Sequence, residues 1–310
     1  MSEDLVMSVA PTRPADRPGA ALELRGDEVV AAFGADSASP LGRGAFGETW
    51  RLDFAGRPSL AAKVLLEHDI SSARFAREVE GLRRVSNPHV VELVDTVSVT
   101  LSGRPRAALV FEFIDGGDLT ARLGQGILVP PEQVLVFAQG LMTGLAALHA
   151  ADTVHRDIKP ANIALRDGSW SAPVILDLGL ARMLDRDSIT AYPALMGTAL
   201  YMAPEQLRFE RARKAADVFA AGVVLHTMLA GEHPFFAGRD TLALTEAVAL
   251  IEAGAPRLAG VAPRCLATLV ARLLTFDEAG RGSASRAKRD LDACVGQAQG
   301  GPDAMEGLRE

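Results

Sequence analysis

Two regions of different character predict an α+β protein with two lobes in this sequence of 310 residues. From about residue 38 to 99, one helical stretch interrupts short apolar segments of strand length, and after residue 115 the chain is mostly helical. Segments that follow each other in this way form distinct layers or lobes. We therefore expect a small β-rich lobe over about 28–114 and a larger helical lobe over about 115–295. A cleft between two such lobes is a common place for a ligand.

Apolar spacing predicts the main elements of both lobes. The run 108–114 is typical of a buried strand, and the segments 131–150 and 215–230 predict two long helices in the second lobe. One helix is predicted in the small lobe by an apolar stripe at helical spacing, formed by Phe75, Val79, Leu82 and Val85.

The two ends of the chain differ in composition from the rest. Residues 1–27 are rich in Pro, Ala, Arg and Gly, and residues 296–310 are polar and Gly-rich, so both predict flexible tails. The start lacks the basic-then-apolar order of a signal peptide. The longest apolar run, 218–231, is too short to span a bilayer. These features predict a cytoplasmic protein without a membrane segment.

Charge and cysteine content limit the partners. The formal net charge is −7, which argues against a nucleic-acid partner, since that usually requires a concentrated basic face. Two cysteines, Cys265 and Cys294, are few for a secreted protein of this size. We therefore expect both to be unpaired thiols in a reducing compartment.

Three glycines near the start of the first lobe have the spacing G-x-G-x-x-G: Gly42, Gly44 and Gly47. Glycines allow a hairpin turn to approach a polyphosphate, so that its backbone N–H groups can meet the phosphate oxygens. A plain flexible turn, or the strand-to-helix turn of a dinucleotide-binding domain, would use the same residues. Because 48–53 continues as a strand, the pattern favours a hairpin lid.

A lysine and a glutamate of the first lobe are expected to pair. Lys63, one of only four lysines, ends the strand that begins at Leu60. Glu78 lies on the apolar helix stripe, and a carboxylate that faces a core needs a partner. The alternatives are a solvated lysine and a glutamate at the edge of the stripe.

The segment 155–163 places an aspartate, a lysine and an asparagine in one short loop after a helix. Asp157 can orient a hydroxyl group and accept its proton, Lys159 can stabilise a migrating phosphoryl group, and Asn162 can bind a metal ion. Asp177 follows the apolar strand 174–176 and is well placed as a Mg²⁺ ligand.

These motifs, in this order and at these intervals, resemble the eukaryotic-type (Hanks-type) protein kinase family from about Leu41 to Leu291. The segments 197–205 and 217–223 look most like bacterial serine/threonine kinases. The resemblance implies a bilobal protein kinase fold, ATP with Mg²⁺ or Mn²⁺ as cofactor, and protein substrates with Ser or Thr acceptors. It also implies in-line transfer of the γ-phosphoryl group of ATP.

The resemblance carries further roles onto this chain. The adenine edge would bond to backbone near Glu112 and Ile114. Glu205 would pair with Arg281. Asp217 would brace the loop 155–163, which the resemblance makes the catalytic loop. Positions that would line the nucleotide site are Leu41, Thr49, Ala61 and Ala164. The chain departs from the family pattern at Thr49, where valine is usual, at Ala164, where a larger residue is usual, and at Leu178, where phenylalanine is usual.

The segment from Asp177 to Glu205 is predicted to be a switch controlled by phosphorylation. A phosphate in this segment would pair with Arg156 and Arg182. The resemblance makes Thr190 the leading site, because it lies eight residues before Thr198, as in the bacterial kinases that the chain resembles. Ser188 and Tyr192 are the alternatives, and dimer formation would allow autophosphorylation in trans. Thr198 is expected to hydrogen-bond Asp157 and Lys159.

Three other protein classes share part of this pattern. A catalytically inactive scaffold of the same fold would usually lack one of Lys63, Asp157 and Asp177. A small-molecule kinase of the aminoglycoside type would lack Lys159-Pro160 and the Ala203-Pro204-Glu205 segment. A tyrosine kinase usually lacks Lys159, so this lysine favours serine and threonine as acceptors.

Overall fold

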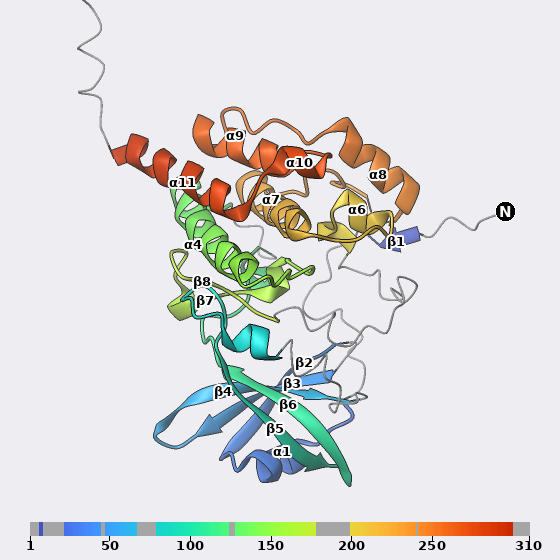
Figure 1. The fold of residues 1–310 in the computed structure, drawn as a ribbon, viewed down its shortest axis with the longest axis vertical. Coiled ribbons are helices and arrows are strands. Elements are labelled where there is room, and N and C mark those ends of the chain that lie inside the picture. The colour runs from blue at the N-terminus through green and yellow to red at the C-terminus, as the bar shows by residue number, and fades with distance from the viewer. Residues whose placement is uncertain are drawn as a thin grey trace, which may run out of the picture.

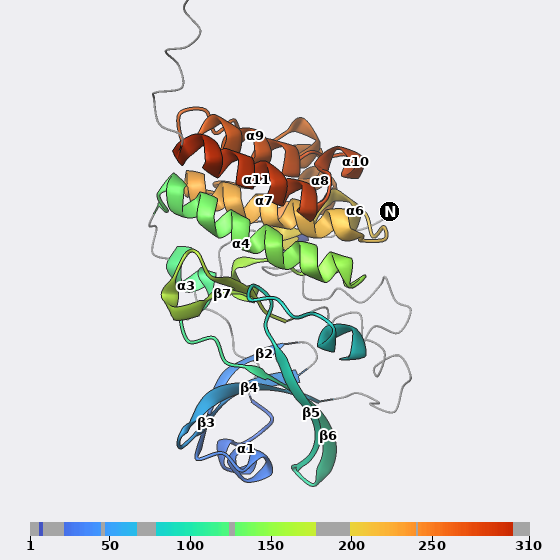
Figure 2. The ribbon, with the colours of Figure 1, turned by 60° about the vertical axis from the view of Figure 1, so that its left-hand side comes forward.

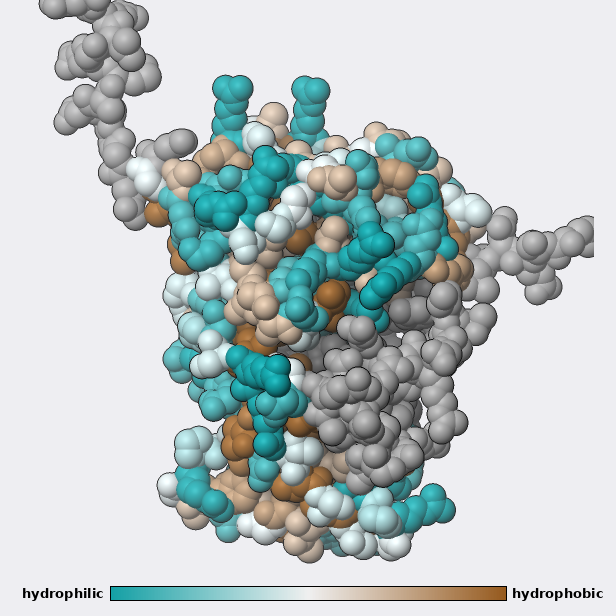
Figure 3. All heavy atoms as spheres, viewed as in Figure 1, coloured by the Kyte–Doolittle hydropathy of each residue, from teal (hydrophilic) through white to brown (hydrophobic). Residues whose placement is uncertain are grey.

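The computed structural model describes residues 6–8, 22–44, 47–66, 79–123, 128–177, 199–239 and 241–299. These residues form two lobes, with the sheet at one end and the helices at the other (Figure 1). The predicted α+β fold of two lobes is therefore confirmed. Hydrophilic side chains cover much of the visible face of the helical lobe, and hydrophobic ones gather around the narrow region between the lobes (Figure 3).

The first lobe is an antiparallel five-stranded sheet with the strand order β2-β3-β4-β6-β5. Its strands are β2 (Ser37–Gly44), β3 (Gly47–Phe54), β4 (Arg57–Leu65), β5 (Leu93–Leu101) and β6 (Arg104–Glu112). Side chains of a strand alternate between the two faces of a sheet. Along β6, Ala108 accordingly belongs to one core, whereas Ala107, Leu109 and Phe111 belong to the core shared with the second lobe.

The outer face of this sheet is covered by the helix α1 (Gly26–Phe33). Val29 of α1 is fully buried, and it lies in one apolar cluster with Leu24, Trp50 and Leu52. The helix ends at Gly34 in the left-handed region (φ 61°), where glycine carries no steric penalty.

Two described parts of the N-terminal segment, 6–8 and 22–27, belong to or contact regular structure, so the expectation of a flexible tail does not hold for these residues. The strand β1 (Val6–Ser8) pairs antiparallel with β9 (Thr241–Ala243) of the helical lobe, with Met7 opposite Leu242 (Figure 1). Residues 22–27 pack on the first lobe and begin α1. Composition did not reveal these contacts, because their partners lie far away in the sequence.

The second lobe is built around two helices, α4 (Pro131–Ala150) and α7 (Lys214–Ala230). The helix α4 has the bounds predicted from the sequence, and α7 begins one residue earlier than predicted. They pack together, and α11 (Ala284–Gln299) lies along α4 (Figure 2). The other helical elements are α3 (Leu119–Leu123), α6 (Pro204–Leu207), α8 (Leu244–Ala253), α9 (Arg264–Leu273) and α10 (Glu278–Arg281), with the 3₁₀ turns η1 (Pro160–Asn162), η2 (Arg166–Gly168) and η3 (Ala199–Tyr201).

Two short strands complete the second lobe at its boundary with the sheet. They are β7 (Ile163–Leu165) and β8 (Pro173–Ile175), which pair antiparallel. Among the described residues, α4 is the helix long and apolar enough to cross a bilayer, but 61% of its most apolar window is buried inside the protein. That burial is the pattern of a core helix.

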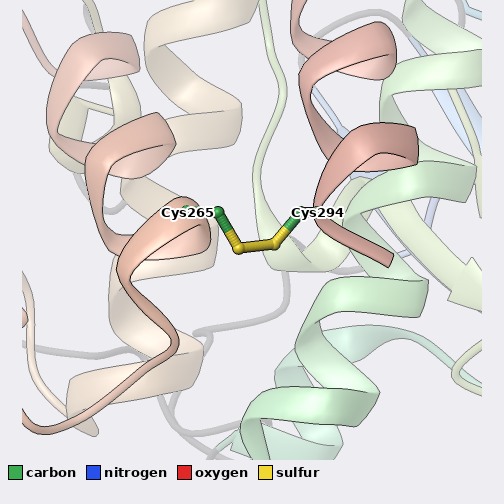
Figure 4. Close-up of a disulfide and its surroundings, with 2 residues drawn as sticks. All are labelled: Cys265 and Cys294. Carbon is green, nitrogen blue, oxygen red and sulfur yellow. A yellow bond between two sulfur atoms is a disulfide. The ribbon is translucent and has the colours of Figure 1, made fainter. Parts of the chain in front are cut away.

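The two cysteines form a disulfide, so the prediction of unpaired thiols is wrong. Cys265 of α9 and Cys294 of α11 are joined, with their Cα atoms 5.8 Å apart (Figure 4). This separation is within the usual range for a disulfide. The number of cysteines does not reveal that α9 packs against α11, and this packing brings the two residues together.

Replacement of Cys265 by Ser should lower the free energy of unfolding by about 3.5 kcal/mol, because the bond joins residues 29 positions apart and so closes a long loop in the unfolded chain. Urea unfolding of the variant and of the parent, each with and without a reductant, measures the effect. The reductant should destabilise the parent and leave the variant unchanged. Two titratable thiols in the unfolded, unreduced parent would contradict the assignment.

Candidate active site between the lobes

The loop 155–162 brings three predicted residues onto one carboxylate. Asp157 Oδ2 accepts a hydrogen bond from Lys159 Nζ at 2.8 Å and one from Asn162 Nδ2 at 2.9 Å. Asn162 Nδ2 also donates to the backbone carbonyl of Asp157 at 2.8 Å. The Asp157 side chain stays one-third exposed. A carboxylate held in this way keeps a fixed direction and can still be reached by a hydroxyl group.

The buried carboxylate of Asp217 holds the start of this loop. It accepts hydrogen bonds from the backbone N–H of His155 (2.9 Å) and of Arg156 (2.6 Å), and His149 Nε2 lies 2.8 Å from its Oδ2. Arg156 adopts φ 69°, an uncommon value for a residue with a side chain. Such a conformation persists only where the surroundings stabilise it, and Asp217 provides that stabilisation.

His155 connects the loop to the strand end that carries Asp177. Its Nδ1 accepts from the backbone N–H of Asp157 (3.2 Å), so Nε2 carries the proton and donates to the carbonyl of Leu176 (2.7 Å). The N–H of Leu176 in turn donates to the carbonyl of Asn162 at 2.9 Å. These bonds place Asp177 beside the catalytic loop.

Lys63 and Asp177 form an ion pair between the lobes. Lys63 Nζ lies 2.8 Å from Asp177 Oδ1, and the lysine side chain is only 12% exposed. Burial raises the pKa of Asp177, but the charge and hydrogen bond of Lys63, with the charge of Lys159, outweigh it and keep that pKa below its ordinary value. Asp177 is therefore an anion at neutral pH.

The donor set at this place fits a Mg²⁺ ion. Mg²⁺ prefers oxygen ligands and takes few of them from the protein. Asp177 offers an ionised carboxylate, and both described hydrogen bonds of the Asn162 side chain are made by its nitrogen, Nδ2. Within the described ranges, no group of three or more His, Cys, Asp or Glu side chains could hold a metal ion. A small ligand set with phosphate oxygens is the arrangement that this site can support.

The glycine-rich segment forms the turn end of β2 and β3, where Gly44 lies opposite Gly47. A Cβ atom on Gly47 would lie 2.1 Å from the carbonyl oxygen of Val64, so the close contact with β4 requires glycine. Thr49 lies opposite Lys63 in the sheet, and Ala61 is on the same face of β4 as Lys63. The expected lining residues Thr49, Ala61 and Lys63 therefore share the face that looks toward the second lobe.

The connection between the lobes begins at Glu112. Its N–H donates to the carbonyl of Glu92 at 3.1 Å. Its carboxylate accepts two hydrogen bonds from Arg166 (2.8 and 3.0 Å). Sequence reasoning missed this ion pair. Ile114 is buried, Leu41 is half-exposed, and Ala164 lies in the core shared by both lobes.

A cavity of about 330 Å³ lies beside this ion pair, lined by Glu112, Arg166, Glu92 and apolar residues such as Leu82. Of the predicted catalytic residues that the structure describes, which are Lys63, Asp157 and Lys159, none lines it. The charged groups converge instead at the Lys63–Asp177 pair and the loop 155–162, which form the candidate active site.

The ion pair between Glu205 and Arg281 fixes the α6 segment. Arg281 is fully buried and donates to both carboxylate oxygens of Glu205, at 2.7 and 3.0 Å. It also donates to the carbonyls of Thr275 and Phe276, and it lies 4.9 Å from the ring centroid of Phe219. Two bonds to one carboxylate are the strong geometry for arginine.

His233 is a residue that the sequence analysis missed. Its Nδ1 accepts from the N–H groups of Phe235 and Phe236 (both 3.1 Å), so the neutral ring donates through Nε2 to the carbonyl of Leu200 (2.8 Å). The ring stacks on Phe236 at 4.6 Å. Burial lowers the pKa of His233 to about 4. A histidine before a proline and two phenylalanines was the available signal, and it is a weak one.

Several predicted residues lie outside the described residues. They are Glu78, Leu178, Gly179, Arg182, Ser188, Thr190, Tyr192 and Thr198. The expected pairing of Lys63 with Glu78 is therefore still a prediction, as are the roles in the segment 178–198.

The fold and the convergence of charged side chains define a two-lobed phosphotransferase domain of the kinase type. Residues 36–290 match the family model described as a protein kinase domain. This match spans most of the chain, so the chain belongs to the protein kinase family.

Curated relatives are bacterial serine/threonine-protein kinases. PkaA of Streptomyces coelicolor is 36% identical over 81% of this chain and 48% of its own length. PkaB of the same organism is 33% identical over 77% of this chain and 59% of its own. The chain thus spans about half the length of these relatives.

A solved structure, that of Rad53 1-466 in complex with AMP-PNP, has the same fold. Its TM-score is 0.66 at 22% sequence identity, and the match covers 81% of this chain and 63% of that one. At this identity the likeness concerns the fold.

The burial of His233 predicts a pH dependence of stability. The unfolded histidine takes up a proton near pH 6.5, but the folded one does so only near pH 4. The unfolded state therefore binds more protons as the pH falls below 6.5, and stability should decrease by about 2 kcal/mol between pH 7.5 and pH 5. Urea unfolding at a series of pH values measures this loss.

His233→Asn is the matched variant, because its side-chain oxygen can accept the two N–H groups without titrating. The buried His226 also has a lowered pKa and stays in both proteins, so its share of the slope is common to them. A slope in His233→Asn as steep as in the parent would contradict the assignment to His233.

Proposed function

We propose that this chain is a serine/threonine protein kinase that transfers the γ-phosphoryl group of MgATP to serine or threonine hydroxyls of proteins. The observation that carries the proposal is the convergence of Lys159 and Asn162 on Asp157, with the Lys63–Asp177 pair beside them. The bacterial relatives support the acceptor class.

The acceptor hydroxyl is oriented by Asp157, which receives its proton as the phosphoryl group leaves ATP. Two hydrogen bonds direct this carboxylate, and such positioning supplies much of the rate in phosphoryl transfer. Lys159 stabilises the charge on the transferred group. The γ-phosphorus–oxygen bond to ADP breaks as the bond to the acceptor oxygen forms.

The rest of the nucleotide is held by groups of both lobes. Lys63 neutralises the non-transferred phosphates, and the backbone of the hairpin with Gly42, Gly44 and Gly47 covers them. Asp177 and Asn162 would hold Mg²⁺, which supplies neutralisation of charge on the phosphate oxygens. The adenine edge bonds to the carbonyl of Glu112 and to the backbone near Ile114.

A cytoplasmic location is part of the proposal, since ATP and protein acceptors are available there. The disulfide between Cys265 and Cys294 would be unusual at that location, because cytosolic thiols are usually kept reduced. Trapping of thiols at the moment of cell lysis, followed by mass analysis of Cys265 and Cys294, tells which state the protein has in cells.

Replacement of Asp177 by Asn should lower the turnover number at least a hundredfold, because a metal ligand worth several kcal/mol in the transition state is lost. The rate of phosphate transfer from labelled MgATP to a generic protein substrate measures it. The control is Asp152→Asn, which removes an exposed carboxylate paired with Lys214. A turnover number of Asp177→Asn close to that of the parent would refute the metal role. A parent chain that binds nucleotide but transfers no phosphate would indicate a catalytically inactive scaffold.

Autophosphorylation of the segment 185–192 is a second testable part of the proposal. The parent should carry phosphate at Thr190, with Ser188 as the alternative, and Asp157→Asn should carry none. Peptide mass spectrometry of the two proteins gives the sites, and mixing active and inactive chains tests transfer in trans. An active parent without phosphate in this segment would exclude this mode of control.

A further inference from the structure

The carboxylate of Glu48 is fully buried, although it lies one residue after Gly47. Along β3, Glu48, Trp50 and Leu52 lie on the face covered by α1, and Thr49 lies on the opposite face. Glu48 is therefore directly behind the glycine-rich hairpin, on the side away from the proposed nucleotide site. A buried charge is costly unless hydrogen bonds compensate it.

Those hydrogen bonds come from the N-terminal segment. The backbone N–H of Glu23 donates to Glu48 Oε1 at 2.5 Å, and the N–H of Leu24 donates to Oε2 at 3.3 Å. Trp50 Nε1 also donates to Oε2, at 3.3 Å. Both oxygens of Glu48 thus hold a chain segment more than twenty residues earlier in the sequence.

Two arginines extend this contact to the rest of the hairpin and the sheet. Arg43, between Gly42 and Gly44, lies 3.6 Å from Glu48 and 3.5 Å from Glu23. The buried Arg106 of β6 donates to Glu23 Oε1 at 2.5 Å and to the carbonyl of Leu66 at 2.6 Å. Glu23 and Leu24 therefore connect both strands of the hairpin to Arg106 of β6, which also bonds the carbonyl of the residue after β4.

The N-terminal segment is itself held firmly in place. Leu24 is 3% exposed, and α1 begins two residues after it and packs on the same cluster. A Cβ atom built on Gly42 or Gly44 would meet nothing within 4 Å, so the space beside these two glycines is open. The contacts of Glu48 on the outer face therefore add a restraint on the hairpin to the one that Gly47 makes with β4.

We propose that Glu48, together with Glu23, is a positioning residue that holds the glycine-rich hairpin in the position in which it covers the phosphates of a nucleotide. The inference rests on the proposed function. A preorganised hairpin loses less conformational entropy when it closes over a ligand, and so it binds more tightly. Because the hairpin would contact phosphates, the effect should appear for ATP and be absent for adenosine.

The test compares dissociation constants of MgATP and of adenosine, measured by calorimetry on the full chain. Glu48→Gln puts an amide NH₂ against the N–H donors of residues 23, 24 and 50, so one donor loses its partner. We expect about a tenfold weaker binding of MgATP, the effect of losing roughly one such hydrogen bond. Adenosine binding should change by less than about twofold.

Two further variants complete the design. Glu23→Gln changes a half-exposed side chain on the outer face of the sheet and should weaken MgATP binding in the same direction, by about threefold. Asp53→Asn is the matched control, because this β3 carboxylate accepts hydrogen bonds from Ser59 and Arg51 at the other end of the strand. It should leave both dissociation constants unchanged.

Each outcome decides the question. The positioning role would be overturned if Glu48→Gln bound MgATP as tightly as the parent does. It would also be overturned if the variant lost affinity for MgATP and for adenosine equally. If circular dichroism shows that Glu48→Gln does not fold, Glu23→Gln decides by the same two criteria. A parent chain that binds no MgATP would overturn the proposed function as well, whereas a binding parent with unchanged variants would overturn this inference alone.

Discussion

The geometry of the active site depends on the need of one buried carboxylate, Asp217, for hydrogen-bond donors. It lies in the first turn of α7, a helix buried on almost every side, so water cannot solvate it. The backbone of residues 155 and 156 supplies donors, and this holds Arg156 in a left-handed conformation. Asp157 and Asp177 take their positions from the loop that results.

Charge pairs set how the two lobes meet. Lys63 of the first lobe contacts Asp177 of the second, and Glu112 of the first forms two hydrogen bonds with Arg166 of the second. Partly buried pairs of this kind have fixed geometry and are less screened by salt than exposed ones. The N-terminal segment adds a further connection, since its parts contact β9 of the helical lobe and the outer face of the sheet.

The need of a buried carboxylate for hydrogen-bond partners bears on two glutamates, Glu78, which the sequence analysis found, and Glu48, which it missed. Glu78 was singled out because a glutamate on an apolar stripe needs a partner. Glu48 has that pattern too, since it alternates with Trp50 and Leu52 along a strand. It went unnoticed because its partners are backbone N–H groups, which carry no signature in the sequence.

The sequence by itself determined what local periodicity and local chemistry control: the two-lobed α+β class, the bounds of α4, and the joint presence of Asp157, Lys159 and Asn162 within one loop. Only the tertiary structure decided the distant partners of Lys63, Glu48, His233 and Cys265, which lie between 24 and 114 residues away in the chain and include Asp177, Leu24, Leu200 and Cys294. The physical reason is that periodicity reports which face of an element is buried, whereas the packing of distant elements decides which atoms meet there.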